Sequence, residues 1–367
     1  MALTGAMSAG ISGLKAHMEA LNTVGNNIAN VNTYGYKPGR VTFRESMYST
    51  QSAGAAGTAT VGGTNPRQTG YGTSVGTIDL DMSSKSLEST GQPLDCAIQG
   101  DGFFLVGAKG LTFSTADDFK KLSLSRVGDF KFDADGYLVD GGGNVVYGFL
   151  TCNADADGKA STTAGTNGNA ISTVLVPIRL PLAAIGGTNN GDPEPGAALY
   201  PGANGATNVE PGIGGTAAGN STGDTINYNS LKIDENGCVS CVNDDTGDVV
   251  VVGYIAQGTV ENPNGLEHAG ECYYTAGEAA GDIAVGTFNS AVQGYLNNPA
   301  DTAGVDAGLR LLNNSQTSLM TGFLESSGTD LAQEFANMIV YQRGYQANTR
   351  IVTVTDSMLE ELVNMKR

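Results

Sequence analysis

One pair of cysteines has the spacing of half a zinc site. Cys238 and Cys241 form a Cys-x-x-Cys motif, and structural zinc sites use two such pairs or one pair with two histidines. The sequence has no second pair at metal spacing, and it holds only two histidines, far apart at positions 17 and 268. We therefore interpret the thiols as small apolar side chains of one strand over residues 231–242.

A second motif resembles the first half of a calcium-binding loop. Asn153, Asp155 and Asp157 alternate and Gly158 follows them, which would place oxygen ligands before a sharp turn. The twelfth position, where a calcium loop needs a bidentate carboxylate, is Ala164. We predict an ordinary Asp/Gly turn here and no bound metal or other cofactor.

Catalytic signatures are equally weak. The sequence contains no glycine-rich phosphate loop ending in lysine. His17 follows Lys15 in the polar part of a predicted helix, and His268 follows Glu267 in a predicted turn, so both imidazoles are expected to be solvated. We predict no catalytic residue and no enzymatic activity.

The composition disfavours several further classes of function. The net charge of −18 disfavours binding to nucleic acid or to an anionic membrane, because both need a basic surface. The 53 glycines indicate many turns, and five cysteines cannot all pair within one chain. No apolar run is long enough to span a membrane, and no cleavable signal sequence is present. The sequence alone therefore predicts a cytoplasmic protein, unless the chain is exported by a route that cleaves no signal sequence.

Both ends of the chain are predicted to be amphipathic helices that pair. Apolar residues at the N-terminus recur at helical spacing, with Gly25 on the same stripe, and the C-terminal segment alternates between spacings of three and four. Thr329 or Asp330 can cap the second helix. A second apolar flank comprises Ile339, Ile351, Val354, Met358 and Leu362. The predicted packing residues are Ile11, Leu14, Met18, Leu21, Ile28, Leu331, Phe335, Met338, Tyr345, Val352, Leu359 and Val363.

The middle of the chain is predicted to be mainly β. Short apolar runs at 77–82, 103–106, 122–127, 145–150, 174–180 and 249–256 alternate with Asp/Gly turn signals. The predicted fold class is α+β and multidomain, with long coiled helical termini and nested β domains of barrel or sandwich type. Residues 1–30 and 325–367 form the helical domain, 31–70 and 300–324 connecting segments, 71–150 and 228–299 an inner β domain, and 151–227 an inserted outer domain.

The motifs that carry these patterns resemble a known family. The N-terminal Gly25-Asn-Asn-Ile-Ala-Asn-Val-Asn-Thr33, the internal Leu87–Asp95 and Gly322–Ser327 segments, and the C-terminal Tyr341-Gln-Arg-Gly-Tyr-Gln-Ala-Asn348 are similar, in this order, to bacterial flagellar rod and hook proteins. The resemblance covers both termini and the inner β domain but not residues 151–227. Its motif residues include Asn26, Asn27, Asn30, Asn32, Gln342, Arg343 and Asn348.

The resemblance implies a subunit that leaves the cell through the flagellar type III export apparatus without cleavage and polymerises outside it. Phe43 and Met47 resemble the export-gate motif of the family, and the alternative is an apolar anchor in the linker. The expected product is the flagellar hook, a flexible tubular joint that transmits torque from rod to filament in bacterial motility. Its partners would be other copies, the distal rod protein, the hook cap and the hook–filament junction protein.

Two alternatives stay open at this stage. The distal rod protein of the same family resembles this chain at both ends, although the length and the closing Glu-Leu-Val-Asn-Met-Lys-Arg favour the hook. A secreted monomer of calcium-binding or adhesive β type, with an intramolecular helix bundle, is the alternative from a different class. Covalent Cys–Lys links between subunits, which the resemblance also suggests, cannot be assigned to a residue pair.

Overall fold

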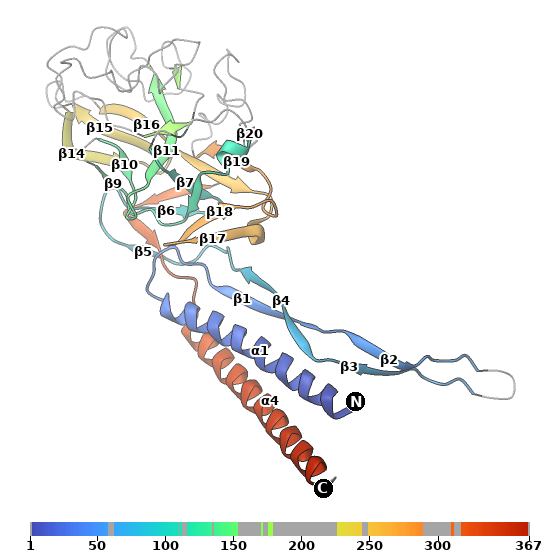
Figure 1. Cartoon of the computed structure of the whole chain (residues 1–367). Helices are drawn as coiled ribbons and strands as arrows, with labels where there is room; N and C mark the ends of the chain where they lie inside the picture. Colours follow the sequence, from blue (N-terminus) through green and yellow to red (C-terminus); the bar gives the residue numbers. More distant parts are fainter. Residues whose placement is uncertain are drawn as a thin grey trace. The chain divides into compact units, whose positions relative to one another are not determined.

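The chain forms two compact units, which we describe separately. The structure, a computed structural model, describes residues 2–57, 62–109, 111, 116–133, 136–152, 170–171, 175–178, 226–243, 249–288, 310–311 and 317–365. Unit 1 contains residues 1–81 and 327–367, and unit 2 contains residues 82–326. Both ends of the chain therefore belong to one unit and its middle to the other (Figure 1).

Unit 1 consists of two helices and a long β-hairpin. The helices are α1 (Ala2–Ala29) and α4 (Leu331–Met365). The Asp330 carboxylate accepts hydrogen bonds from the backbone N–H groups of Ala332 and Gln333 at 2.9 and 3.3 Å, so Asp330 caps α4. The antiparallel pair β1 (Gly39–Glu45) and β4 (Thr73–Leu80) continues along the chain into β2 (Tyr48–Ser52) and β3 (Arg67–Gly70).

Residues 31–70, predicted as a connecting segment, contain three strands. Their side chains are mostly Thr, Ser, Gln and Gly, and most are exposed on both faces of the hairpin. Alternation between apolar and polar residues, the usual strand signal, is absent from such a ribbon.

Unit 2 is mainly β, and fourteen of its described strands join one sheet. The main path of the sheet runs β14-β15-β16-β11-β7-β8-β18-β17, and we find no closed barrel among the described strands. The elements are β5 (Leu87–Ser89), β6 (Cys96–Gln99), β7 (Phe103–Gly107), α2 (Ala116–Phe119), β8 (Ser123–Ser125), β9 (Lys131–Phe132), β10 (Leu138–Val139), β11 (Val145–Cys152), β12 (Ala170–Ile171), β13 (Val176–Pro177), β14 (Ile226–Ile233), β15 (Cys238–Asn243), β16 (Val249–Val260), the 3-10 helix η3 (Pro263–Gly265), β17 (Leu266–Gly270), β18 (Tyr273–Ala276), β19 (Ile283–Thr287), β20 (Arg310–Leu311), β21 (Ser318–Thr321) and β22 (Phe323–Glu325).

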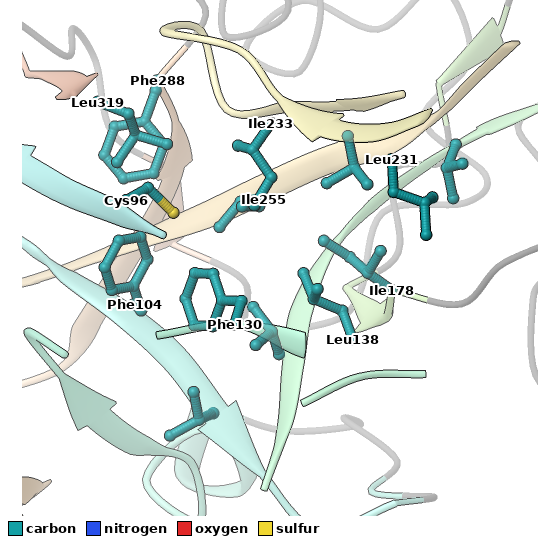
Figure 2. Packing of buried hydrophobic residues seen from close by; sticks show 14 of the residues in the cluster. Cys96, Phe104, Phe130, Leu138, Ile178, Leu231, Ile233, Ile255, Phe288 and Leu319 are labelled. Carbon is teal, nitrogen blue, oxygen red and sulfur yellow. The ribbon is translucent and has the colours of Figure 1, made fainter. Parts of the chain in front are cut away.

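The core of unit 2 is a cluster of buried aliphatic and aromatic side chains. Phe104 contacts Phe130 edge to face, with ring centroids 5.0 Å apart, and Phe288 at 6.2 Å. Cys96, Leu319, Ile233 and other aliphatic side chains complete the cluster (Figure 2). Residues Phe103–Val106 and Val145–Phe149 are buried in strands, and the α+β class predicted from the sequence is confirmed.

The segments that enter and leave unit 2 are paired with each other. β5 pairs with β22, and β6 pairs with β21, which brings residues 87–99 beside residues 318–325. A buried ion pair lies in the same region, with Arg126 Nη1 3.5 Å from Glu325 Oε2 and both side chains almost fully covered. Glu325 Oε1 also accepts a hydrogen bond from the Lys85 backbone N–H at 2.9 Å.

Candidate assembly surface

The two helices of unit 1 pack against each other in opposite directions. A Cβ atom added to Gly10 would lie 3.2 Å from Val352, and one added to Gly13 would lie 2.7 Å from the Asn348 amide. Further along α1, Asn27 donates a hydrogen bond to Glu334 of α4 at 3.2 Å. Residue numbers rise along α1 as they fall along α4, so the helices are antiparallel (Figure 1).

Small residues form the face of α1 that is covered. Gly10, Gly13, Ala16 and Ala20 are buried, as is Val24 one turn further on. Glycine and alanine let two helix backbones approach closely, because little side-chain volume separates them. The intramolecular seam therefore uses small side chains and leaves most of the large apolar ones elsewhere.

Asn27 fastens the end of α1 to the hairpin and to α4. Its side chain is 1% exposed, and its Oδ1 atom accepts hydrogen bonds from the Gly39 N–H at 3.1 Å and the Tyr36 hydroxyl at 3.0 Å. Its Nδ2 atom donates to the Gly39 carbonyl at 2.9 Å and to Glu334. The polar capacity of this buried amide is thus fully used, as burial requires.

The other N-terminal motif asparagines shape the turn that follows α1. Asn26 donates to the Tyr36 hydroxyl at 3.2 Å, and Asn30 donates to the Asn26 carbonyl at 2.9 Å. Asn32 is exposed. Gly35 has φ +68°, a backbone conformation that glycine adopts without strain, and it directs Tyr36 toward this network.

An aromatic cluster holds the hairpin against both helices. The Phe43 ring lies 5.6 Å from His17 of α1 and 5.9 Å from Tyr341 of α4, measured between ring centroids. The Nδ1 atom of His17 is buried without a hydrogen-bond partner. The prediction of a solvated His17 is wrong, because the hairpin covers one side of the ring. The helical spacing of the sequence does not predict this hairpin. Phe43 contacts both helices although its side chain is 39% exposed, and Met47 is 78% exposed.

The predicted N-terminal stripe is only partly buried. Ile11 and Met18 are 37% and 50% exposed, while Leu14, Leu21 and Ile28 are half-buried. The apolar pattern located the helix, but its most buried face lies beside the stripe and consists of smaller residues.

The C-terminal helix exposes most of its large apolar residues. Of the predicted packing residues, Met338, Val352 and Leu359 are half-buried, whereas Leu331, Phe335, Tyr345 and Val363 are exposed. The second flank is exposed throughout: Ile339, Ile351, Val354, Met358 and Leu362 are between 44% and 59% accessible. In the C-terminal motif Gln342 and Arg343 are exposed, and Asn348 is half-buried against Gly13.

Burial raises the pKa of Glu334, the one acidic residue in the first turn of α4. The hydrogen bond from Asn27 acts in the opposite direction, and the negative charge of Asp330 adds to the rise. The Oε2 atom of Glu334 is buried without a hydrogen-bond partner. The seam thus contains one carboxylate that is only partly satisfied.

The thiols and the remaining histidine lie in unit 2. Residues 231–242, predicted as one strand, form a hairpin in which β14 ends at Ile233 and β15 begins at Cys238, with Gly237 at φ +72° in the turn. Burial raises the pKa of Cys238 and of Cys241 to about 12. His268 lies in β17 rather than in a turn, and burial lowers its pKa.

The described residues contain no metal-binding site formed by the metal-like motifs. Among these residues, no three His, Cys, Asp or Glu side chains gather in a metal-binding arrangement. The calcium-like loop at 153–164 and most of the predicted insertion at 151–227 lie outside the described residues. No helix in the described part combines the length and the apolar character needed to cross a membrane.

Comparison with known proteins matches the two segments that form the seam. Residues 7–37 match the family described as "Flagella basal body rod protein", and residues 320–365 match "Flagellar basal body rod FlgEFG protein C-terminal". Over 98% of this chain and 97% of its own length, the flagellar basal-body rod protein FlgG of Bacillus subtilis is 34% identical.

Hook proteins are similar over comparable lengths. The flagellar hook protein FlgE of Borreliella burgdorferi is 25% identical over 97% of this chain and 98% of its own. That of Salmonella typhimurium is 27% identical over 98% of this chain and 99% of its own. The similarity therefore extends well beyond the two matched segments.

Proposed function

We propose, from the premise that this chain belongs to the flagellar basal-body rod and hook protein family, that it is a structural subunit of the flagellar hook. Copies would polymerise into a flexible tube that transmits torque from rod to filament. Members of this family are structural components of the flagellum, so self-association rather than catalysis is the activity to explain.

The apolar surface that α4 exposes carries this proposal. Ile339, Val340 and Leu362 are 59%, 63% and 52% exposed although α4 is already paired with α1. Exposed apolar side chains in such number mark a surface that another protein covers. Contacts between different faces of successive copies generate an open helical assembly when the rotation between copies does not close a ring.

The distal rod is the second candidate, because the rod protein of Bacillus subtilis is 34% identical over nearly the whole chain. The hook proteins, at 25% and 27% identity, are equally complete matches in length. Immunogold labelling of isolated hook–basal bodies separates the two candidates. Label along the hook supports our proposal, and label confined to the rod replaces it with the alternative.

Polymerisation is tested by changing the exposed face of α4. The triple variant Ile339→Gln, Val354→Gln, Leu362→Gln retains good helix formers and should leave the free subunit folded, because all three side chains are exposed. We expect it to form no tubes in electron micrographs or pelleting assays. A matched apolar triple, Ile339→Leu, Val354→Ile, Leu362→Met, should still assemble. Tubes from the glutamine triple at the parent's critical concentration would refute the proposed surface, and deletion of residues 332–367 should abolish assembly outright.

We further propose that Phe43 and Met47 act in export, before unit 1 folds. Phe43 packs against His17 and Tyr341 in the folded chain, where its side chain is 39% exposed, so an export receptor could enclose the whole ring only in an unfolded subunit. Met47 is 78% exposed, so Met47→Ser should reduce secretion into the medium without changing thermal stability. Normal secretion of Met47→Ser would leave the apolar-anchor interpretation of this segment.

The remaining partners in this proposal are the neighbours of a hook in the flagellum. The distal rod protein would contact its first subunits, the hook cap its growing end, and the hook–filament junction protein its finished end. Pull-down of each protein by assembled tubes, with the glutamine triple as control, tests these contacts.

A further inference from the structure

All of the excess negative charge of the chain belongs to unit 2. Unit 1 contains nine Lys and Arg residues and nine Asp and Glu residues, so its formal net charge is zero. Unit 2 contains ten Lys and Arg residues against 28 Asp and Glu residues, which accounts for the entire −18. The unit with the exposed apolar helices is therefore the neutral one.

The acidic excess is concentrated within unit 2 as well. Residues 233–309 include twelve Asp and Glu residues and no Lys or Arg. Among the described residues of this stretch, the carboxylates of Glu267, Glu271, Glu278 and Asp282 are exposed near β17, β18 and β19. No basic side chain of the same stretch can neutralise them.

Unit 1, in contrast, mixes charges of both signs on an apolar background. Arg40 pairs with Asp79 across the hairpin at 3.6 Å. Along α4, the exposed Arg343 and Arg350 share the helix with the exposed Asp356 and Glu360. Two copies that approach through this surface meet no net like charge, so apolar burial there is not opposed by long-range repulsion.

We propose that repulsion between the acidic units 2 of neighbouring copies sets the ionic strength at which association through the neutral unit 1 begins. This inference rests on the proposed function and deepens it. The chain joins the two units, so copies that pack through unit 1 bring their acidic units closer than they are in free solution. Repulsion between these units keeps unassembled subunits apart and raises the critical concentration.

Screening should therefore control assembly. The Debye length shortens from about 10 Å at 0.1 M salt to about 3 Å at 1 M. Sodium and magnesium salts should lower the critical concentration equally at equal ionic strength if they only screen the repulsion. A far stronger effect of magnesium would instead indicate that the carboxylates bind divalent ions, and it would overturn the screening mechanism.

The test measures the critical concentration of the full chain by pelleting between 0.1 and 1 M NaCl at neutral pH. Salt also strengthens apolar burial, so charge is isolated by two matched variants. The first, Glu267→Gln, Glu278→Gln, Asp282→Asn, lowers the net charge of unit 2 from −18 to −15. The second, Glu19→Gln, Glu45→Gln, Asp81→Asn, removes as many exposed carboxylates from unit 1 but none from α4.

Repulsion between like units scales with the product of their charges, so the unit 2 variant should lose about 30% of the charge-dependent salt response. Its critical concentration should fall at low salt. The unit 1 variant should keep the parent's full response. Equal responses in all three proteins, or a parent that assembles independently of salt, would overturn the inference while leaving the proposed function intact. Failure of the parent to polymerise at every salt concentration would refute the proposed function and this inference with it.

Discussion

Replacement of Gly344 by alanine tests whether the two terminal helices touch in the free subunit. A Cβ atom at position 344 would lie 2.6 Å from Nε2 and 2.7 Å from Cε1 of His17. The imidazole cannot simply turn away, because Phe43 and Tyr341 lie against it, with ring centroids 5.6 and 6.2 Å from its own. The substitution therefore compresses the seam.

Two effects of opposite sign decide the outcome. Alanine in a helix interior is about 1 kcal/mol more favourable than glycine. Overpacking a closed contact costs about 1–3 kcal/mol. Gly344→Ala should therefore lower the free energy of unfolding of the helix pair by between zero and about 2 kcal/mol. Gly25→Ala is the matched control, because a Cβ atom there meets nothing within 4 Å, and it should stabilise α1 by up to about 1 kcal/mol.

The assay is unfolding of the subunit under conditions that prevent assembly, followed by the helical circular dichroism signal. In a His17→Ala background the clash is absent, so Gly344→Ala should regain the stabilisation seen for Gly25→Ala. This double-mutant cycle isolates the contact between the two residues. If Gly344→Ala stabilises the parent as much as Gly25→Ala does, the helices are not paired in the free subunit and order only on assembly.

Three further predictions concern buried polar groups. Asn27→Ala removes four hydrogen bonds and should cost about 2–4 kcal/mol of stability in denaturant unfolding, whereas Asn32→Ala, at an exposed position, should change it by less than about 0.5 kcal/mol. Arg126→Met leaves the buried Glu325 carboxylate without its ion-pair partner and should destabilise unit 2 by about 3–5 kcal/mol, and adding Glu325→Gln should recover about half of that loss. Burial raises the pKa of Glu334 above its ordinary 4.5, so the protonated side chain favours the folded helix pair. The stabilisation that protonation provides is complete below pH 4.5 and is lost as the pH rises through the raised pKa. Glu334→Gln keeps an oxygen acceptor for Asn27, so it should stabilise the helix pair at pH 7 and flatten the pH dependence of thermal unfolding. A pH profile identical to the parent's would show that Glu334 does not titrate in the seam.

The sequence was sufficient for the elements that bury apolar residues at a regular period. The terminal helices follow from spacings of three and four, and strands such as β7 and β11 follow from compact apolar runs between turn signals. The hairpin over residues 39–80 could not be predicted in full, because β2 and β3 bury no apolar face and are stabilised by cross-strand backbone pairing. The hairpin β14–β15 was read as a single strand, because Cys238 and Ile233 are both apolar and the turn between them is short.

The inner face of α1 was missed for a different physical reason. A search for large apolar residues selects Ile11 and Met18, whereas the buried face consists of Gly10, Gly13, Ala16 and Ala20. The signal was present in the sequence as small residues at spacings of three and four. This signal could not be weighed against the apolar stripe without knowing which face of α1 the second helix covers.

These two faces together explain how one helix pair can be stable within a subunit and still drive assembly. If the large side chains of α4 filled the seam with α1, the pair would be satisfied and nothing apolar would remain for a neighbour. In the seam, the side chains of Val352, Asn348 and His17 instead lie against the glycines of the facing helix. A hydrogen bond from the buried Asn27 amide to Glu334 adds to these contacts without consuming apolar area. Each subunit therefore retains its large apolar residues for contacts with other copies, and because unit 1 has no net charge, those contacts can form wherever the acidic units are sufficiently screened.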